Sequence, residues 1–313
     1  MPRVVELCGG VGGAKLADGL QAVVGPDLTV VVNSGDDLER HGLRIWPDHD
    51  TVAYTLAGLD DEERGWGIAG ESWTVIETLA ARGEDAWFRL GDRDLATHLV
   101  RTERLGRSER PTDVARALAA SLRIPATILP MTDDEVRTEV RTPDGWLDFQ
   151  EYFVHRRQAP EVLDVRFRGI EAACITPEAT AAIDAADVIV IAPSNPIVST
   201  GPILALPGTR EALAAAASRR TPIVAVSGIV GGRALRGPAD RMLTSLGHEP
   251  TALGVARIYA GIADRFVLDA VDRHLAPKIE ALGMRTRVTD TVMTDDTARA
   301  RLAAEVLEFA VAA

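Results

Sequence analysis

Carboxylates gather in the segment NSGDDLERHGLRIWPDHDT, which covers residues 33–51 and follows the apolar run LTVVV. The four acids are Asp36, Asp37, Asp48 and Asp50. Grouped hard oxygen ligands are what Mg²⁺ requires, and a carboxylate beside a metal can take a proton, so the pattern favours metal-assisted phosphoryl transfer. A solvated loop and a ribose-binding acid are the alternatives. Asp50 could also cap a helix that begins at Thr51, whereas His41 and His49 alone are weak signals.

Loops rich in glycine, serine, asparagine and proline follow four apolar runs. They are CGGVGGAK (8–15), NSGDD (33–37), APSNPIVSTGP (192–202) and SGIVGGRALRGPAD (227–240). Such loops bring backbone N–H groups close to a ligand, and a helix start adds a partial positive charge, so together they predict a phosphate-bearing ligand. We expect the nucleotide or its phosphates to contact Gly10, Gly12, Gly13, Lys15, Ser194 and Asn195.

The first loop departs from two familiar phosphate-binding motifs. A Walker A loop ends in Gly-Lys-Ser/Thr, but Lys15 follows Ala14 and precedes Leu16. The dinucleotide fingerprint G-x-G-x-x-G/A, counted from Gly10, meets Lys15 where a small residue belongs. An NAD(P)-dependent oxidoreductase using Asp36 for the ribose is therefore an alternative that the motif supports poorly. A non-catalytic nucleotide-sensing regulator is a second alternative, although a sensor has no need of crowded carboxylates.

A second group of charged residues lies in the segment FRLGDRDLATH, residues 88–98. Asp92 or Asp94 could cap the helix LATHLVR, which would place Arg89 and His98 at its start or in its first turns. Helix starts packed toward a ligand also hold acceptor substrates, so this segment is a candidate acceptor site.

The order of the predicted elements indicates an α/β fold. Near-continuous apolar strands alternating with helices predict a doubly wound, mostly parallel, Rossmann-like sheet. We assign residues 1–50 and 156–313 to this nucleotide-binding core. Residues 51–155 are predicted to be a helical insertion plus a β-hairpin that complete the acceptor site, with the hairpin at 136–154 around Pro-Asp-Gly. The exposed hairpin edge favours self-association as a homodimer.

Composition narrows the class of protein. The 313 residues are 46% hydrophobic and 26% charged, with a net charge of −12. This acidity argues against nucleic acid as the main partner, because a polyphosphate backbone binds basic surfaces. We see no signal peptide and no apolar run that could span a bilayer, and the two cysteines form no disulfide framework. A cytoplasmic enzyme acting on small molecules is the expectation.

Several separated motifs together resemble one family. In chain order they are GGVGGAK, VVNSGDD, HGLRIWPDHDT, RGWGI, LGDRDLATH, ILPMTDD, DFQEYFV, APSNPIVSTGPIL and LRGPADRML. The chain resembles the 2-phospho-L-lactate transferase (CofD-like) family, including its actinobacterial phosphoenolpyruvate transferase branch (FbiA), over essentially its whole length. The combination of LGDRD, SNP and PD-x-DT is the specific part of the match.

The resemblance implies a reaction in the biosynthesis of coenzyme F-420. A phosphoacid passes from its guanosine diphosphate adduct to the terminal hydroxyl of the deazaflavin Fo, GMP is released, and Mg²⁺ is required. Fo-contacting positions of the family correspond here to Asp50 and Arg89, and we expect Asp92 beside them. Asp50 would act as the base that deprotonates the Fo hydroxyl.

Other positions follow from this reading. Asp36 and Asp37 would bind the metal, directly or through water. Trp46 and Trp66 could border the deazaflavin or simply pack. His49 stands where the family usually has leucine between the two aspartates of PD-x-DT.

Overall fold

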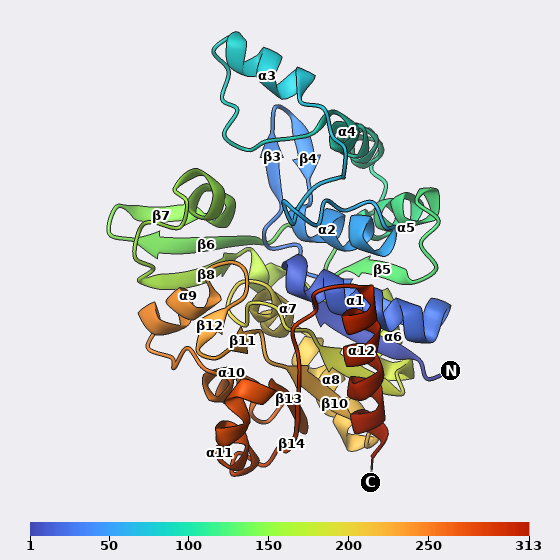
Figure 1. The fold of residues 1–313 in the computed structure, drawn as a ribbon. Coiled ribbons are helices and arrows are strands. Elements are labelled where there is room, and N and C mark those ends of the chain that lie inside the picture. Colours follow the sequence, from blue (N-terminus) through green and yellow to red (C-terminus); the bar gives the residue numbers. More distant parts are fainter. Residues whose placement is uncertain (313) are drawn as a thin grey trace.

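A parallel sheet of seven strands forms the centre of the computed structural model, which describes residues 1–312 (Figure 1). In spatial order the strands are β14 (Arg285–Thr289), β13 (Arg265–Asp269), β10 (Ile223–Val226), β9 (Val188–Ile191), β1 (Val4–Cys8), β2 (Leu28–Val32) and β5 (Thr127–Pro130). Every neighbouring pair is parallel. The prediction of a doubly wound α/β fold is confirmed.

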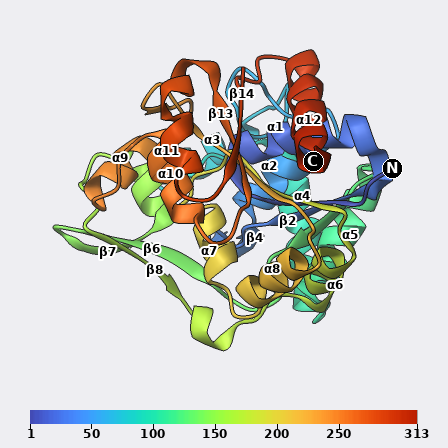
Figure 2. The ribbon, with the colours of Figure 1, turned by 90° about the horizontal axis from the view of Figure 1, so that it is seen from below.

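Helices bury both faces of this sheet, which explains the continuous apolar strands. Val4 and Cys8 of β1 pack on one face, whereas Val5 and Leu7 pack on the other. The first face is covered by α1 (Gly10–Val24), α2 (Pro47–Leu56) and α12 (Asp296–Val311). The second face is covered by α6 (Pro177–Ala185), α7 (Thr200–Ala205), α8 (Thr209–Ser218) and α10 (Ala252–Tyr259). Figure 2 shows α1 and α12 on the opposite side of the strands from α6 and α8.

The strand order reverses next to β1. The chain continues from β1 to β2 on one side, and β9 returns on the other side and leads to β10. In open α/β sheets the ligand binds at such a switch point, outside the carboxyl ends of the strands. The loops after β1 and β9 are therefore the first place to look for a site.

A helical insertion rises from the β2 side of the sheet. It consists of the hairpin β3 (Leu38–Arg40) and β4 (Leu43–Ile45), then α2 and the helices α3 (Thr74–Ala81), α4 (Asp92–Gly106) and α5 (Pro111–Ser121). The α3 segment projects furthest, at the top of Figure 1. The chain then enters the main sheet as β5, so the range 51–155 assigned to the insertion contains one strand of the core sheet.

The predicted hairpin at 136–154 is present as β6 (Arg137–Thr142) and β7 (Gly145–Asp148). A third strand, β8 (Asp164–Arg168), pairs with the other edge of β6 and was not expected from the sequence. The free edges of this small sheet are therefore β7 and β8, and self-association through it stays a prediction.

The remaining elements are short. They include α9 (Ala239–Ser245), α11 (Ala276–Glu280), and the two-residue strands β11 (Ile229–Val230) and β12 (Arg233–Ala234). Within residues 1–312, no helix combines the length and apolarity needed to cross a membrane.

Candidate active site

The loop after β1 meets the loop after β9 at the switch point. Helix α1 begins at Gly10 with Gly9 as its N-cap, and its first turn carries no acidic residue. A β-carbon on Gly12 would collide with the carbonyl oxygen of Pro193, and one on Gly13 would lie 2.6 Å from the β-carbon of Cys8. Glycine is therefore required here because the two loops touch, and the N–H groups at the start of α1 can face an anion.

Side chains of the β9 loop hold this contact in place. Ser194 Oγ donates to the carbonyl oxygen of Gly9 at 2.7 Å. The side-chain oxygen of Asn195 accepts a hydrogen bond from the backbone N–H of Ile197 at 2.9 Å. The structure thus brings Ser194 to the predicted glycine loop, and Asn195 shapes the turn beyond it.

Lys15 of α1 is hydrogen-bonded to the segment before α12. Its Nζ donates to the carbonyl oxygen of Met293 at 3.0 Å. Partial burial, followed by the nearby guanidinium groups of Arg299 and Arg236, lowers the pKa of Lys15. A phosphate contact by Lys15 stays a prediction.

Asp48 is the carboxylate directed at the phosphate loop. One of its oxygens accepts from the backbone N–H of Gly10 at 2.9 Å, and the other accepts from Asn33 Nδ2 at 2.9 Å. Burial raises the pKa of Asp48 to about 6, against the lowering effect of these two hydrogen bonds. Asp48 therefore connects the end of β2 to the N-terminus of α1 through neutral donors only.

Asp36 and Asp37 lie on the loop after β2, close to Asp48 of α2. Asp36 is 5% exposed, and within the described chain its Oδ1 has no hydrogen-bond partner. Burial, and then the charge of Asp48, raise the pKa of Asp36 well above its ordinary value. Burial also raises the pKa of Asp37, partly opposed by Arg137. A buried carboxylate oxygen without a partner is what a hard divalent ion would satisfy, so Asp36, with Asp37 next to it, fits Mg²⁺.

Asp50, two residues from Asp48, has a different environment. Both of its oxygens accept from Arg101, one of them at 3.0 Å from Nη1. Arg101 is fully buried, with its guanidinium carbon 4.5 Å from the centre of the Trp46 ring. Burial alone would raise the pKa of Asp50, but the charge and hydrogen bonds of Arg101, together with His49 and His98, outweigh it and hold this pKa well below the usual range. Trp46 therefore packs against Arg101 and also lines the smaller of the two cavities described below, and a contact of Trp46 with the deazaflavin stays a prediction.

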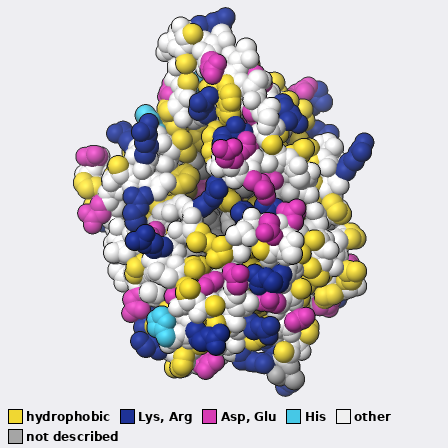
Figure 3. Space-filling view, in the orientation of Figure 1, with side chains coloured by type: hydrophobic (Ala, Val, Ile, Leu, Met, Phe, Trp, Pro, Cys, Tyr) yellow, Lys and Arg dark blue, Asp and Glu magenta, His cyan; other side chains and the backbone are white. Residues whose placement is uncertain are grey.

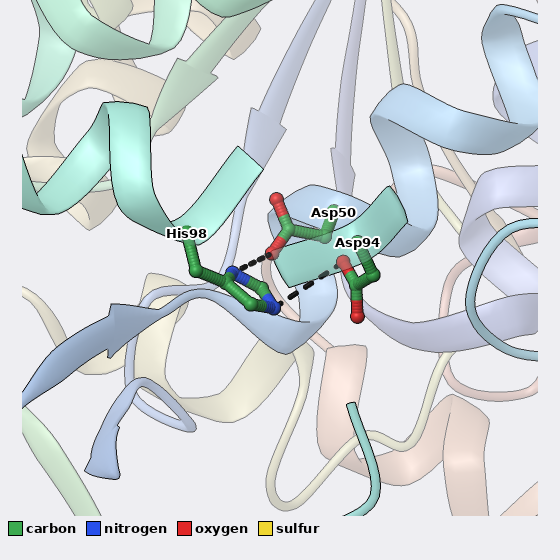
Figure 4. Close-up of side chains that lie close together, drawn as sticks. All are labelled: Asp50, Asp94 and His98. Carbon is green, nitrogen blue, oxygen red and sulfur yellow. Dashed lines mark ion pairs between the residues drawn. The ribbon is translucent and has the colours of Figure 1, made fainter. Parts of the chain in front are cut away.

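A buried network extends from Asp50 into α4 (Figure 4). His98 Nδ1 lies 3.7 Å from Asp50, and His98 Nε2 lies 3.2 Å from Asp94. Tyr54 donates to Asp94 at 2.6 Å. Ligand atoms of Asp50, Asp94 and His98 lie within 4.8 Å of one another, as in a metal site. Arg101 also approaches His98 Nδ1 at 3.1 Å, and its positive charge disfavours a cation there, so we interpret the network as an ion-pair link between α2 and α4.

The structure corrects both expected helix starts. Helix α2 begins at Pro47, so Asp50 lies inside it and does not cap a helix beginning at Thr51. Helix α4 begins at Asp92 with Gly91 as its N-cap, so neither Asp92 nor Asp94 caps it. The carboxylate of Asp92 instead accepts from the backbone N–H groups of Thr74 and Val75, at the start of α3.

The residues predicted to contact Fo do not all meet. Arg89 is half-exposed and stacks on Trp73 at 4.4 Å, with Glu77 at 3.9 Å. Asp50 lies buried in the α2–α4 network. Trp66 is exposed and packs edge-on against Trp73, close to Arg89 rather than to the carboxylates. The Fo contacts of Asp50, Arg89 and Asp92 stay predictions.

The two histidines of the acidic segment, which were weak signals in the sequence, also lie apart. His41 is exposed in the turn between β3 and β4, away from the carboxylates. His49 is buried against Trp46, with its Nδ1 3.9 Å from Asp50. Burial lowers the pKa of His49.

Two cavities adjoin the carboxylates. The smaller, of about 210 Å³, lies over the ends of β2 and β5 and is lined by residues that include Asn33, Asp37, His49 and Arg137. The larger, of about 660 Å³, is lined by Asp36, Asp37 and the aromatic residues Trp87, Trp146 and Phe149. Figure 3 shows a hollow between the projecting lobe and the body, with acidic and basic side chains around it.

Sequence reasoning missed Arg101, Arg137 and the aromatic wall. Asp94, His98 and Arg101 stand at positions i, i+4 and i+7, so they share one face of α4. A helix face made only of ionisable residues, opposite a cluster of acids, could have indicated this pairing. Trp87 lies in the loop before α4 and Trp146 in β7, and no local pattern links them.

The comparison with known protein families gives one match across the chain. The family model described as 2-phospho-L-lactate transferase CofD matches residues 4–309. The chain belongs to the CofD family. Membership makes it a transferase, and this confirms the resemblance found in the separated motifs.

Curated relatives cover nearly the whole chain. Proteins named phosphoenolpyruvate transferase are 46% identical in Streptomyces griseus and 44% identical in Streptomyces coelicolor, each with 98% of both chains covered. The protein of this name from Mycobacterium avium is 41% identical, again with 98% of both chains covered. Among solved structures, a UPF0052-family protein of Bacillus halodurans has a TM-score of 0.63 at 17% identity and covers 98% of this chain and 100% of its own. That likeness establishes the shared fold.

Proposed function

We propose that the protein transfers a phosphoacid from its guanosine diphosphate adduct to the terminal hydroxyl of the deazaflavin Fo, releasing GMP, in coenzyme F-420 biosynthesis. The observation that carries this proposal is the contact of Asp48 with the backbone N–H of Gly10, beside Asp36, at the topological switch point. The names of the curated relatives favour phosphoenolpyruvyl as the transferred group, with 2-phospho-L-lactyl as the alternative.

The donor's diphosphate would lie at the start of α1. The N–H of Gly10 already donates to Asp48, so the N–H groups of Val11, Gly12 and Gly13 would donate to the diphosphate oxygens, and the partial positive charge of the helix start would favour them. Ser194 and Asn195 would hold the β9 loop against the glycine loop. Guanosine would bind on the β9 and β10 side. The close contacts of Gly12 and Gly13 support this assignment because they fix the position of the β9 loop beside the start of α1.

Asp36 and Asp37 would hold Mg²⁺. When bound there, the ion would spread the negative charge that develops as the bond from phosphorus to GMP breaks. The unpartnered oxygen of Asp36 and its proximity to Asp48 support this assignment.

Fo would enter the larger cavity, whose size and aromatic side chains suit a tricyclic ring. A carboxylate must then take the proton of the Fo hydroxyl. Asp50 remains the predicted base on the family resemblance, but Arg101 neutralises it in this structure. Asp48 has no cationic partner in the described chain and points at the phosphate loop, so the geometry favours Asp48.

Mass spectrometry of the reaction product tests the proposal. The purified protein is incubated with Fo and the guanylated donor of phosphoenolpyruvate or phospholactate, with Mg²⁺ or with excess chelator. We expect an Fo adduct heavier by the phosphoacid, equimolar GMP, and no product with chelator. GDP binding without any Fo adduct from either donor would contradict the proposal.

Nucleotide preference is a separate check. Thermal shifts with GDP, ADP and NAD should stabilise the protein most with GDP, and a ligand at a hundredfold excess over its Kd adds about 2.7 kcal/mol. Stabilisation by NAD alone would favour the oxidoreductase instead. Light scattering tests the proposed homodimer, and a monomer of 33.5 kDa at micromolar concentration would exclude it.

A further inference from the structure

The two cavities share one wall. The space over β2 and β5 and the aromatic space meet at five residues that line both, namely Asp37, Leu38, Arg44, Glu135 and Arg137. Asn33 lines the smaller cavity and also donates to Asp48, which in turn accepts from Gly10. The smaller cavity is therefore one side chain away from the carboxylate that contacts the phosphate loop.

The two cavities differ in volume, so they suit different ligands. A space of about 210 Å³ accommodates an acid of three carbons, and it lacks room for a deazaflavin. In an in-line displacement the leaving GMP and the attacking hydroxyl lie on opposite sides of the phosphorus. The organic acid is a third substituent on that phosphorus, so it needs a space of its own beside this axis.

Two of the four acids that line the smaller cavity already have hydrogen-bond partners. Asp133 accepts from Arg110 at 2.9 Å and from the backbone N–H of Thr112 at 2.8 Å. Asp134 accepts from the backbone N–H of Cys174 at 3.1 Å. These carboxylates are held by the surrounding structure, and Asp37 lies beside the proposed metal.

Two arginines, Arg44 and Arg137, line the smaller cavity, and Arg137 is the more buried of the two, with a guanidinium that is only loosely paired. Its side chain is 16% exposed, and its closest carboxylate, Glu135 at 3.6 Å, is itself 60% exposed. Its Nη1 donates to the carbonyl oxygen of Val136 at 3.0 Å, which leaves further N–H groups for a ligand. A planar guanidinium beside a small cavity matches a carboxylate.

We propose that the smaller cavity binds the carboxylate of the transferred three-carbon acid and that Arg137 is its charge partner. The inference rests on the proposed function, since it assigns a place to one part of that donor. Arg137 acts in donor recognition, and the GMP half of the donor does not depend on it.

The test compares two donors. One is GDP esterified with enolpyruvate, and the other is the isopropenyl ester of GDP, in which a methyl group replaces the carboxylate. We expect wild-type protein to favour the enolpyruvyl donor in kcat/KM by roughly 10- to 100-fold, as for one charge-assisted hydrogen-bonded pair. Arg137→Gln should lose that preference by lowering kcat/KM for the enolpyruvyl donor alone. Arg137→Lys should retain part of it.

Controls separate this inference from the proposed function. GDP affinity of Arg137→Gln should stay within about threefold of wild type, and its melting temperature should stay close to wild type. Arg116→Gln is the matched variant, because Arg116 is half-exposed, loosely paired with Asp113 at 3.8 Å, and outside both cavities. It should leave the preference unchanged.

Three outcomes would overturn the inference. Equal losses with both donors in Arg137→Gln would assign Arg137 a general structural role. An unchanged preference would place the carboxylate elsewhere. Wild-type protein that turns over neither donor while binding GDP would refute the proposed function itself, and the inference with it.

Discussion

Asp48 and Asp50 are two residues apart on α2, and both are buried, yet their surroundings are opposite. Asp48 accepts hydrogen bonds from a backbone N–H and an amide, and its pKa rises to about 6. Asp50 accepts from a fully buried arginine, and its pKa falls. The comparison teaches that the partner of a buried carboxylate, rather than its burial, decides whether it serves chemistry or holds helices together.

Asp48→Asn should have the largest effect on turnover. Asn can still accept from Gly10, but it cannot take a proton or add negative charge beside the metal. We expect kcat to fall by roughly 10²- to 10⁴-fold, with GDP affinity within about threefold of wild type. Asp50→Asn is the comparison. If only the Asp50 variant loses turnover while its melting temperature is normal, the base is Asp50. The roles assigned here to the two aspartates would then be wrong.

Arg101→Met should have the largest effect on stability. It leaves Asp50 buried without its cation, and breaking a buried pair in this way costs about 3–5 kcal/mol. Urea denaturation of wild type and variant measures the change. The double variant with Asp50→Asn should recover part of the loss, because no buried charge then remains unpaired at that contact. A loss below about 1 kcal/mol in the single variant would show that the pair is dispensable.

At acidic pH, the proposed metal site beside Asp48 should bind Mg²⁺ more weakly. Burial holds the pKa of Asp48 at about 6 and raises that of Asp36, so protons compete with the metal. Calorimetry should show affinity falling as the pH drops below about 6, and little binding by Asp36→Asn. Affinity that is the same at pH 5 and pH 7.5 would place the metal elsewhere.

Within the described chain, the carboxyl group of Glu6 has neither the neutral donors that Asp48 has nor the cation that Asp50 has. It is fully buried in β1, its oxygens lack hydrogen-bond partners in the described chain, and burial raises its pKa well above 4.5. A raised carboxyl pKa means that the folded state holds the proton more tightly, so stability falls as pH rises from about 4.5 toward the folded pKa. Glu6→Gln should remove that slope, with a gain of about 1–3 kcal/mol over wild type at pH 8. Urea denaturation measures the unfolding free energy of both proteins. A difference between them that is the same at pH 5 and at pH 8 would contradict this expectation.

Arg89→Ala should have the smallest effect on stability. Arg89 is half-exposed, so we expect a change within about 0.5 kcal/mol. The family resemblance predicts an Fo contact, and KM for Fo should then rise severalfold at unchanged kcat. An unchanged KM would remove Arg89 from the acceptor site and leave Asp50 and Asp92 as the predicted Fo contacts to test.

Local patterns predicted much of the fold because their physical cause is local. Apolar runs such as LTVVV mark strands buried on two faces, and the glycines after β1 mark a close approach of backbones. The hairpin at 136–154 followed from Pro-Asp-Gly between alternating residues. The third strand beside it, β8, was missed because its pairing with β6 spans distant residues.

By itself, the sequence determined that a parallel α/β sheet would carry acids and glycine loops at the carboxyl ends of its strands, and the combined motifs determined the family. Only the tertiary structure decided which acid does what. Arg101 lies 51 residues from Asp50 along the chain and reaches it because α4 packs beside α2. Arg137 and the aromatic walls reach the carboxylates from separate elements in the same way. Charge is a property of each residue, but pKa, pairing and accessibility depend on neighbours that only folding brings into contact.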